Sequence, residues 1–406
     1  MNRPKSERDS VAPWYWQPVR WLGGVGVCLY YRTAYRVTGW GRLPRRRGPT
    51  LLLINHQHDI ESSVIVATMT VLSGSWRYPI FTVSSRRMWE PDFMAQRIPW
   101  VRPFVRGINF GHVFSAMGMQ PIENELHSKP LLSVAYMLTE LHGDLPVNEA
   151  FRERVLSSLP AEIERVSDLL KPANSKAASV YASLSDLREP YRSQALERTR
   201  EQLEADSLHF ERLVKEGATL FLAPEGFYTK DGRMQRLRGL LPRLLPLASV
   251  WLCGISYDMF VGRNLWMLYR CAAAVPGVPL DLQLKRLRPV TVSALLGTWL
   301  YRHPSRFTER EAVDEVRSQL EALPRTLFVE PGLRRRTRAR VHAALAGLQR
   351  LGIVVPGADG SFTVADERKH PQWPRTDDVL AYQANFHEET LAGAASFEPS
   401  RVNAAS

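Results

Sequence analysis

The sequence predicts an α/β protein with a central mixed sheet flanked by helices, a helical insertion and a mainly helical C-terminal extension. Three apolar runs carry this prediction, and each ends in a polar turn: LLLI before NHQHDIE, TLFL before APEG, and VWLCGI before SYD. Short apolar runs of this kind are typical of buried strands. The ends of such strands form the crevice where α/β proteins bind ligands, so these three turns are the expected site of function.

Residues 1–50 differ from the rest of the chain in charge and aromatic content. The 406 residues include 53 Lys and Arg against 41 Asp and Glu, a net charge of +12, and residues 1–50 contribute ten basic and two acidic residues. They also contain eight Trp and Tyr residues. Such rings favour the headgroup level of a bilayer, and arginines are drawn to anionic lipid. We expect this segment to lie at a membrane interface, although a basic arm on a soluble protein has the same composition.

The segment is expected to lie on the membrane rather than to cross it. Its apolar run, Trp21–Tyr31, is bounded by arginines and is shorter than the roughly 20 residues that a span requires. No cleavable signal peptide is recognisable, because charges recur on both sides of the run. Three cysteines without CxxC spacing fit a reducing compartment. The expected location is the cytoplasmic side of a membrane, peripheral or monotopic.

Residues 51–275 are expected to form the main domain. After the first apolar run, a helix is predicted over Ser62–Leu72 and a strand over Tyr78–Ser85. The stretch from Met88 to Gly118 is rich in aromatic residues and predicts loops and short helices, either near lipid or in an irregular core. From about residue 126 to residue 216 the sequence becomes helical and charged, with an apolar seam that ends before Gly217. This part is expected to be a helical insertion whose role is packing.

Residues 276–365 are expected to form the C-terminal extension, in which short helices alternate with proline breaks. The stretch TRARVHAALAGLQRLGIV followed by GADGSFTVA predicts a helix and a hairpin. That pattern resembles a winged helix, although simple helical caps share it. Residues 366–406 are expected to be a polar tail that ends in a disordered stretch of small residues.

The polar turn NHQHDIE admits three interpretations: a metal site, a catalytic base with its helper, or a polar strand end. His56 and His58 are separated by one residue, so on a strand they would share a face, and Asp59 would add an oxygen ligand. Hydrolases that bind zinc through such a pair need further ligands downstream. The other histidines are scattered, without HxH or HxxxH spacing. The metal interpretation is therefore the weaker one.

A catalytic base requires His56 and Glu61 to converge. Five residues apart in one helix they would point in different directions, but they converge if His56 lies in the turn and Glu61 in the first helical turn. His58 or Asp59 would then stand near the helix cap. A carboxylate bonded to one imidazole nitrogen fixes the tautomer, and the other nitrogen can remove a proton from a hydroxyl. Because no GxSxG sequence or other strong nucleophile is present, direct attack by a substrate hydroxyl is the economical mechanism.

Together, NHQHDIE and the downstream LFLAPEGFYTKDGRMQRLRG resemble the glycerophospholipid acyltransferases, the family of 1-acylglycerol-3-phosphate acyltransferase. That family has His-x4-Asp after an Asn, a PEG-containing block, and a last strand similar to WLCGISYD. The resemblance covers about residues 51–258, interrupted by the helical region. It implies an acyltransferase fold in which the histidine deprotonates an acceptor hydroxyl, and the hydroxyl attacks the thioester of acyl-CoA or acyl carrier protein.

The resemblance assigns roles to particular residues. His56 is the general base, and Glu61 stands where the family usually has Asp, so the helper is one methylene longer. Asn55, which precedes the histidine as in the family, is assigned to substrate binding. The third block, which helps to hold the acceptor, comprises Pro224, Glu225 and Gly226.

Two positions depart from the family pattern. Tyr228 stands where the family usually has an Arg that contacts the acceptor phosphate, and Asn124, in GMQPIEN, stands at the Arg position of the second block. Each departure removes an arginine that could bind phosphate through two hydrogen bonds. Lysophosphatidate is therefore a doubtful acceptor. The nearby basic residues that would substitute are Lys230, Arg233, Arg236 and Arg238.

The expected function is acyl transfer in phospholipid or glycerolipid biosynthesis. The expected partners are an acyl thioester donor, a membrane lipid acceptor and an anionic membrane surface, with no metal and no cofactor besides the donor. The alternatives are a catalytically weak relative that binds lipid and an HxH metal-dependent hydrolase. Basic charge also fits nucleic acid, but tryptophans beside the arginines favour lipid, so no nucleic-acid partner is expected.

Overall fold

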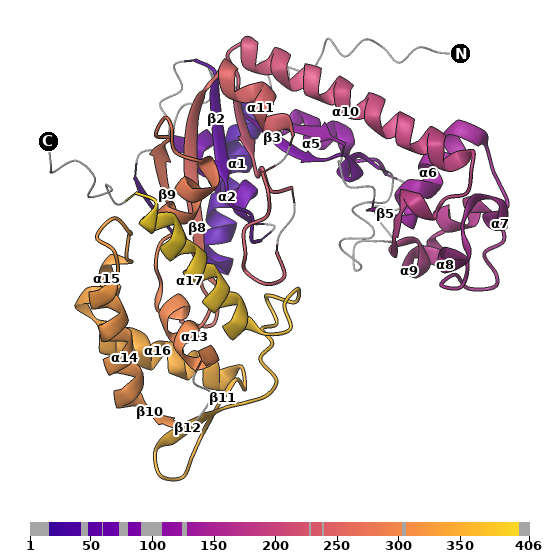
Figure 1. Cartoon of the computed structure of the whole chain (residues 1–406). Helices are drawn as coiled ribbons and strands as arrows, with labels where there is room; N and C mark the ends of the chain where they lie inside the picture. Colours follow the sequence, from indigo (N-terminus) through magenta and orange to yellow (C-terminus); the bar gives the residue numbers. More distant parts are fainter. Residues whose placement is uncertain are drawn as a thin grey trace, which may run out of the picture. The chain divides into compact units, whose positions relative to one another are not determined.

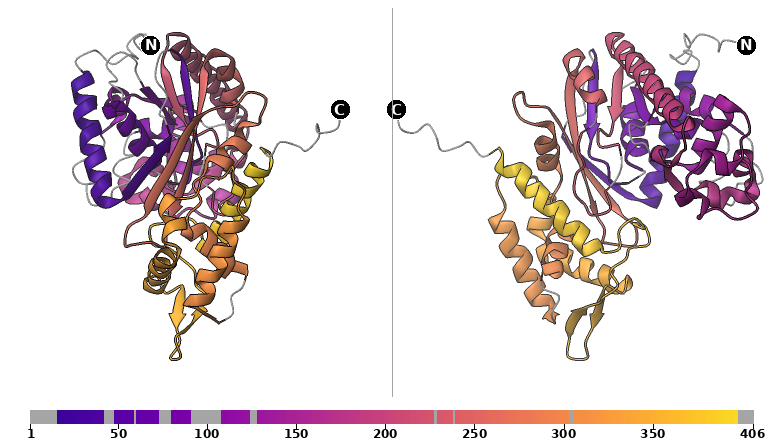
Figure 2. Two further views of the ribbon diagram at one scale, coloured as in Figure 1. Left: turned by 90° about the vertical axis from the view of Figure 1, so that its left-hand side faces the viewer. Right: turned by 45° about the vertical axis from the view of Figure 1, so that its right-hand side comes forward.

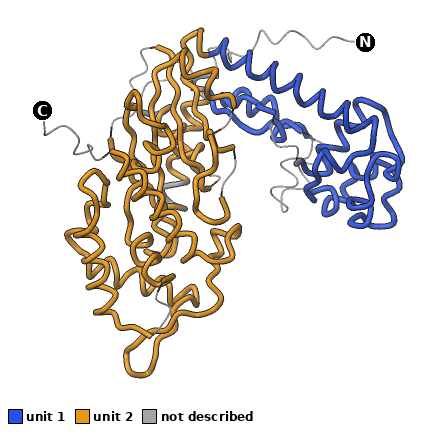
Figure 3. Tube along the Cα trace, in the orientation of Figure 1, with its two compact units in different colours: residues 1–14, 81–213 blue, residues 15–80, 214–406 orange. Residues whose placement is uncertain are grey.

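The computed structural model describes residues 16–41, 48–58, 60–72, 80–90, 108–123, 128–226, 229–237, 239–302 and 306–397. It confirms the predicted α/β class, with a mixed seven-stranded sheet in the order β1-β9-β8-β2-β7-β3-β4. The chain divides into two compact units (Figure 3). Unit 1 contains residues 81–213, and unit 2 contains residues 15–80 and 214–406.

Five strands of the sheet belong to unit 2, in the order β1-β9-β8-β2-β7. β2 (Thr50–Ile54) is buried at every residue and pairs in parallel with β7 (Thr219–Leu222) and β8 (Ser249–Asp258). These three strands are the apolar runs that the sequence predicts. β8 pairs antiparallel with β9 (Trp266–Ala273), a strand that the sequence analysis missed. Since β2 and β7 run in parallel and end side by side, their polar turns meet at one edge of the sheet.

Helices lie on both sides of this sheet (Figures 1 and 2). The long α1 and the predicted helix α2 pack against each other on one side, and α12 lies against β8 on the other. Gly254 permits the close approach of α12, because a Cβ there would lie 2.5 Å from the backbone nitrogen of Arg288. The helices of unit 2 are α1 (Trp16–Ala34), α2 (Ile60–Leu72), α11 (Leu240–Leu244), α12 (Leu280–Leu287), α13 (Val292–Arg302), α14 (Glu309–Ala322), α15 (Pro331–Arg335), α16 (Thr337–Arg350) and α17 (Val379–Ala395).

The basic segment expected at residues 1–50 is not separate from the sheet of the main domain. β1 (Arg36–Gly41) pairs in parallel with β9 along its whole length, so part of the basic segment is an edge strand. α1 precedes it and leaves Trp21, Leu22, Leu29 and Tyr30 exposed. Among the described helices, none combines the length and the apolar character needed to cross a membrane. The aromatic residues at 14 and 15 lie outside the described residues.

The C-terminal extension shares its core with the sheet of unit 2. One cluster of buried side chains runs from β2 and β8 through α13 and α16 to α17, so the boundary expected at residue 276 does not separate two cores. The predicted helix and hairpin are α16 with β11 (Val354–Pro356) and β12 (Ser361–Val364), and β10 (Phe307–Thr308) completes a small antiparallel sheet in the order β10-β12-β11.

The expected polar, disordered tail is wrong for residues 366–397. Trp373 and Tyr382 are buried, and the small residues of LAGAA form the end of α17. Gly393 there lies against the backbone of α12, a contact that larger residues would prevent. Small residues in this stretch serve close helix packing rather than disorder.

Unit 1 holds the predicted insertion and begins earlier than expected, at residue 81 rather than about 126. The strand β3 (Ile80–Ser85), predicted from Tyr78, pairs in parallel with β4 (Met119–Ile122). A second buried cluster lies between residues 131 and 195. The other elements are α5 (Gly111–Ala116), β5 (Ser128–Pro130), α6 (Leu131–His142), α7 (Val147–Ala150), α8 (Glu153–Leu156), α9 (Ser175–Ala178), β6 (Tyr181–Ser183) and α10 (Tyr191–Lys215), which ends just before Gly217 as predicted.

Candidate functional site

The turn after β2 is fixed to the neighbouring strand β8. The side-chain amide of Asn55 donates to the carbonyl of Ile255 at 3.0 Å and accepts from the backbone N–H of Ile255 at 2.6 Å. Gln57 donates to the same carbonyl at 2.7 Å. Asn55 is completely buried, so its side chain positions the turn, and its expected contact with substrate stays a prediction.

His56 and Glu61 converge as the sequence predicts. Nδ1 of His56 lies 2.8 Å from Oε2 of Glu61, which stands in the first turn of α2. The side chain of Glu61 is 0% exposed and that of His56 is 20% exposed. Glu61 also accepts the backbone N–H groups of Gln57, at 2.9 Å, and His58, at 3.0 Å. A buried carboxylate thus fixes the imidazole, and Nε2 becomes the nitrogen available for proton transfer.

The carboxyl of Glu61 lies in a desolvated environment. Burial raises its pKa, and the hydrogen bond with His56 is the largest influence that opposes this rise. Nearby, burial and the charge of Glu61 raise the pKa of the Tyr257 phenol well above its ordinary value. A buried carboxylate gains most from a positive imidazolium beside it, because Coulomb attraction strengthens as the local dielectric falls. The pair is therefore suited to stabilise a protonated His56.

Glu225, in the PEG block, holds the backbone of His56. Its Oε1 accepts the N–H of His56 at 2.9 Å, and its Oε2 accepts the N–H of Gln235 at 2.8 Å. Glu225 and Pro224 are buried, and Gly226 is exposed. Burial raises the pKa of Glu225 to about 7, against the attraction of Arg288. Glu225 thus joins the two polar turns, and its expected contact with the acceptor stays a prediction.

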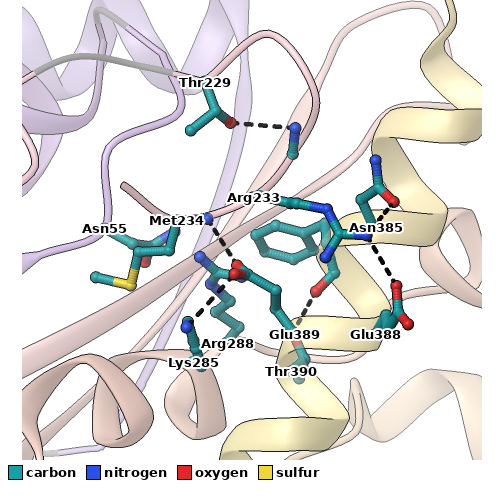
Figure 4. A network of polar contacts seen from close by, with 12 residues as sticks. Asn55, Thr229, Arg233, Met234, Lys285, Arg288, Asn385, Glu388, Glu389 and Thr390 are labelled. Atoms are coloured by element: carbon teal, nitrogen blue, oxygen red, sulfur yellow. Dashed lines mark hydrogen bonds and ion pairs between the residues drawn. The ribbon is translucent and has the colours of Figure 1, made fainter. Parts of the chain in front are cut away.

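The loop after the PEG block, residues 229–237, is attached to α17 (Figure 4). Arg233 donates to Asn385 at 3.0 Å and to Glu388 at 3.1 Å, and Asn385 donates to the carbonyl of Asp231 at 2.9 Å. Gly232 has φ +83°, and a Cβ there would lie 2.2 Å from the carbonyl oxygen of Tyr382. Only glycine combines this backbone conformation with so close a contact.

A buried ion pair joins α12, α17 and the same loop. Arg288 is almost completely buried, and its Nη1 lies 3.2 Å from Oε2 of Glu389. That oxygen also accepts the N–H of Met234 at 2.7 Å, while Lys285 lies 3.4 Å from the other oxygen (Figure 4). The guanidinium of Arg288 stacks over the ring of Phe386 at 4.3 Å. Neither Arg288 nor Glu389 was predicted from the sequence.

The basic residues expected to hold the acceptor have different surroundings. Lys230 and Arg236 are exposed beside the PEG block, whereas the contacts of Arg233 with α17 give it a structural role. The remaining positions of the expected site lie outside the described residues: Asp59, Asn124, Tyr228 and Arg238.

The residues expected to form the third polar turn, SYD, are instead the last, buried residues of the strand β8, and Tyr257 among them packs against His58. The His58 ring lies 5.3 Å from the ring of Trp373, 5.9 Å from Tyr257 and 6.4 Å from Tyr35, measured between centroids. Asp258 accepts a hydrogen bond from Ser293 of α13, and burial raises its pKa to about 6. Within the described part of the chain, no three His, Cys, Asp or Glu side chains gather as metal ligands would.

No protein-family model matches the sequence, and no curated protein matches it significantly. The strand ends of β2 and β7 bring together a histidine bonded to a buried carboxyl and a second buried carboxyl. The neighbouring His58 packs in an aromatic cluster to which Trp373 contributes.

Proposed function

We propose that the protein is an acyltransferase that moves a fatty acyl group from a thioester donor to a hydroxyl of a lysophospholipid or glycerolipid acceptor. The observation that carries the proposal is the pair of His56 and Glu61: a partly exposed imidazole bonded at 2.8 Å to a fully buried carboxylate. This arrangement is what a general base requires, because the tautomer is set and the positive form is stabilised.

In the proposed reaction, Nε2 of His56 takes the proton of the acceptor hydroxyl while that oxygen forms a bond to the thioester carbonyl carbon. The tetrahedral intermediate then collapses, and its carbon–sulfur bond breaks. The leaving thiolate takes the proton from His56, so the products are an ester and a free thiol. Acyl-CoA and acyl carrier protein are both donors of this chemical class.

The side chains of Lys230 and Arg236 are proposed to attract the acceptor or the donor phosphate, because both are exposed beside the PEG block. Arg233 is engaged with Glu388 and Asn385, so a double arginine clamp is not built from this residue. We therefore propose that the enzyme does not strongly prefer lysophosphatidate over diester or neutral acceptors.

The apolar face of α1 supports the proposed location at a membrane. Leu22, Leu29 and Tyr30 are each at least 60% exposed. Leu22 and Leu29 are seven residues apart and so share one face of α1, and Trp21 and Tyr30 flank that face. An exposed apolar stripe on a helix with arginines nearby is typical of interfacial helices. The protein is proposed to bind an anionic membrane surface through α1, on the cytoplasmic side.

The structure weighs against the hydrolase alternative. His58 packs among the rings of Trp373, Tyr257 and Tyr35. An HxH metal pair would need both imidazoles to direct nitrogens at one ion. A weak or inactive lipid-binding relative differs from the proposed enzyme only in turnover, which makes turnover the decisive measurement.

The test is consumption of acyl-CoA by purified variants at saturating acceptor. General-base catalysis contributes about 10²–10⁴ in rate, so His56→Ala should lose that much while donor binding persists. His58→Ala is the matched control, because it removes an imidazole two residues away and should lose much less. Chelators and added zinc should have no effect.

If His56→Ala and His58→Ala reduce turnover equally, and chelation abolishes it, the protein is the metal-dependent hydrolase instead. No thioester consumption by the wild type with any lysolipid in a panel, despite lipid binding, would favour the inactive relative.

A further inference from the structure

Five arginines surround a surface cavity of about 740 Å³ in the C-terminal part of unit 2: Arg317, Arg334, Arg335, Arg336 and Arg338. We call it the arginine cavity. It lies where α14, α15 and the start of α16 come together, and these helices lie beside one another in Figure 1. Its volume is in the range of small-molecule sites, and neither the proposed acyl transfer nor the core requires so many cations there.

The positive charge of the arginine cavity is only partly neutralised. Glu309, the single acidic residue of its lining, is shared by His342 at 3.2 Å and Arg338 at 4.0 Å. Arg317 pairs with Asp314. Arg335 and Arg336 are exposed and have no ion pair among the described residues. Neighbouring guanidinium groups repel one another, so a bound anion would relieve an existing electrostatic cost.

The cavity lining indicates which kind of anion fits. Arginine presents a planar fork of donors that matches phosphate oxygens bidentately. The lining contains no Phe, Tyr or Trp, so a stacking platform for bases is missing from the residues that form it. These features favour a compact anion with several phosphate oxygens.

An extended nucleic acid fits this surface less well. The helix α14 beside the cavity exposes Glu311 and Asp314, and the hairpin tip at residues 356–360 carries Asp359 and no lysine or arginine. A duplex bound by a helix and hairpin would place phosphates along both elements, where positive charge is needed. On α14 the exposed Arg310 lies beside Asp314, so acidic and basic side chains are mixed there, whereas the arginines are concentrated at the cavity.

We propose that the arginine cavity binds a compact anion carrying two or more phosphate groups, and that Arg335 and Arg336 contact it. The anion is either a soluble diphosphate compound or the headgroup of a lipid with two phosphates, such as cardiolipin. This site is independent of the proposed acyl transfer, since its residues take no part in the arrangement around His56.

The test measures binding of inorganic pyrophosphate to the full-length protein by calorimetry. The double variant Arg335→Gln/Arg336→Gln should bind about tenfold more weakly or worse, because two charge-assisted contacts are lost. The matched control is Arg310→Gln/Arg325→Gln, which removes the same charge from two exposed positions outside the cavity lining. It should bind pyrophosphate nearly as the wild type does.

A vesicle experiment distinguishes the two sources of the anion. Sedimentation with phosphatidylcholine vesicles that contain cardiolipin should depend on Arg335 and Arg336 if the ligand is a headgroup, and should be unaffected by the double variant if the ligand is soluble. The proposal is overturned if neither ligand distinguishes the double variant from the wild type, or if the control pair weakens binding equally. Binding of duplex DNA that depends on Arg335 and Arg336, without binding of pyrophosphate or cardiolipin, would also overturn it.

Discussion

At the scale of single residues, Glu61 is the side chain on which the proposed base depends. Its oxygens accept two backbone N–H groups and bond with His56. Glu61→Gln keeps the size but presents N–H₂ where only acceptors fit, so turnover should fall about 10²-fold or more. Glu61→Asp retains the charge and should keep part of the activity, although its carboxylate is one methylene shorter. Thioester consumption at saturating acceptor measures both, and full activity of Glu61→Gln would contradict the proposed role.

Glu225 makes stability depend on pH. Its pKa rises from an ordinary value of 4.5 to about 7 in the folded protein, so between these values the folded state binds more protons than the unfolded state. Its contribution to the free energy of unfolding is therefore full below pH 4.5 and is lost as the pH rises to about 7, by about 3 kcal/mol. Urea unfolding of the wild type and Glu225→Gln across this window should give a flatter pH dependence for the variant. Parallel curves would show that Glu225 is not the titrating group.

The sequence predicted the pair of His56 and Glu61 because strand, turn and helix place two residues of one short segment. It did not predict the bond from Glu225 to the backbone of His56, because that bond joins residues 169 positions apart and depends on β7 lying beside β2. Nothing in the sequence indicated that Arg288 is buried, since the stretch KRLRP reads the same whether this arginine is buried or exposed. The direction of a side chain is set by packing, which local patterns do not contain.

At the scale of elements, α17 holds the loop after the PEG block through Glu389. Glu389→Ala should lower the free energy of unfolding by about 3–5 kcal/mol, because Arg288 would be left as a buried charge without its partner. The double variant Arg288→Met/Glu389→Met should recover much of this loss. Chemical unfolding of Arg288→Met, Glu389→Met and the double variant gives the coupling free energy.

The surface pair between Arg233 of the loop and Glu388 of α17 is the control for this prediction. Their side chains are about half exposed, so Glu388→Ala should cost no more than about 1 kcal/mol. Equal losses from Glu388→Ala and Glu389→Ala would show that burial of the ion pair does not determine its contribution.

The elements that the sequence analysis missed share a physical cause. β1 is short and half-exposed, and its residues RVTGWG occur in a segment dominated by arginines and aromatic rings, so composition concealed the strand. α17 contains the polar residues Gln383, His387 and Thr390, which are buried, and it packs against α12 and α13. By contrast, β2, β7 and β8 were predicted because strands covered by helices on both sides are uniformly apolar.

At the scale of the whole molecule, the net charge of +12 and the exposed face of α1 should act together on anionic membranes. Leu22→Ser/Leu29→Ser should reduce binding to vesicles containing phosphatidylglycerol by about tenfold or more, because two apolar side chains no longer enter the interface. High salt should weaken the binding of the wild type as well. Vesicle sedimentation measures both effects.

The matched control is Tyr301→Ser/Val355→Ser, which removes two apolar side chains exposed elsewhere in unit 2. This variant should bind vesicles as the wild type does. Equal binding by the α1 variant and the control would place the membrane contact somewhere other than α1. Point variants are preferable to deletion of residues 1–47, because deletion would also remove β1 from the sheet.

The attachment of Met234 to Glu389 also orders events in time during synthesis. A ribosome adds residues from the N-terminus, at about 5–20 residues per second. A nascent chain that ends before residue 389 already contains His56, Glu61 and Glu225, yet it lacks the carboxylate that accepts the Met234 N–H and pairs with Arg288. Translation therefore delays completion of the loop that holds Glu225. A growing chain that is already long enough to contact a membrane should consequently have little of the proposed acyltransferase activity.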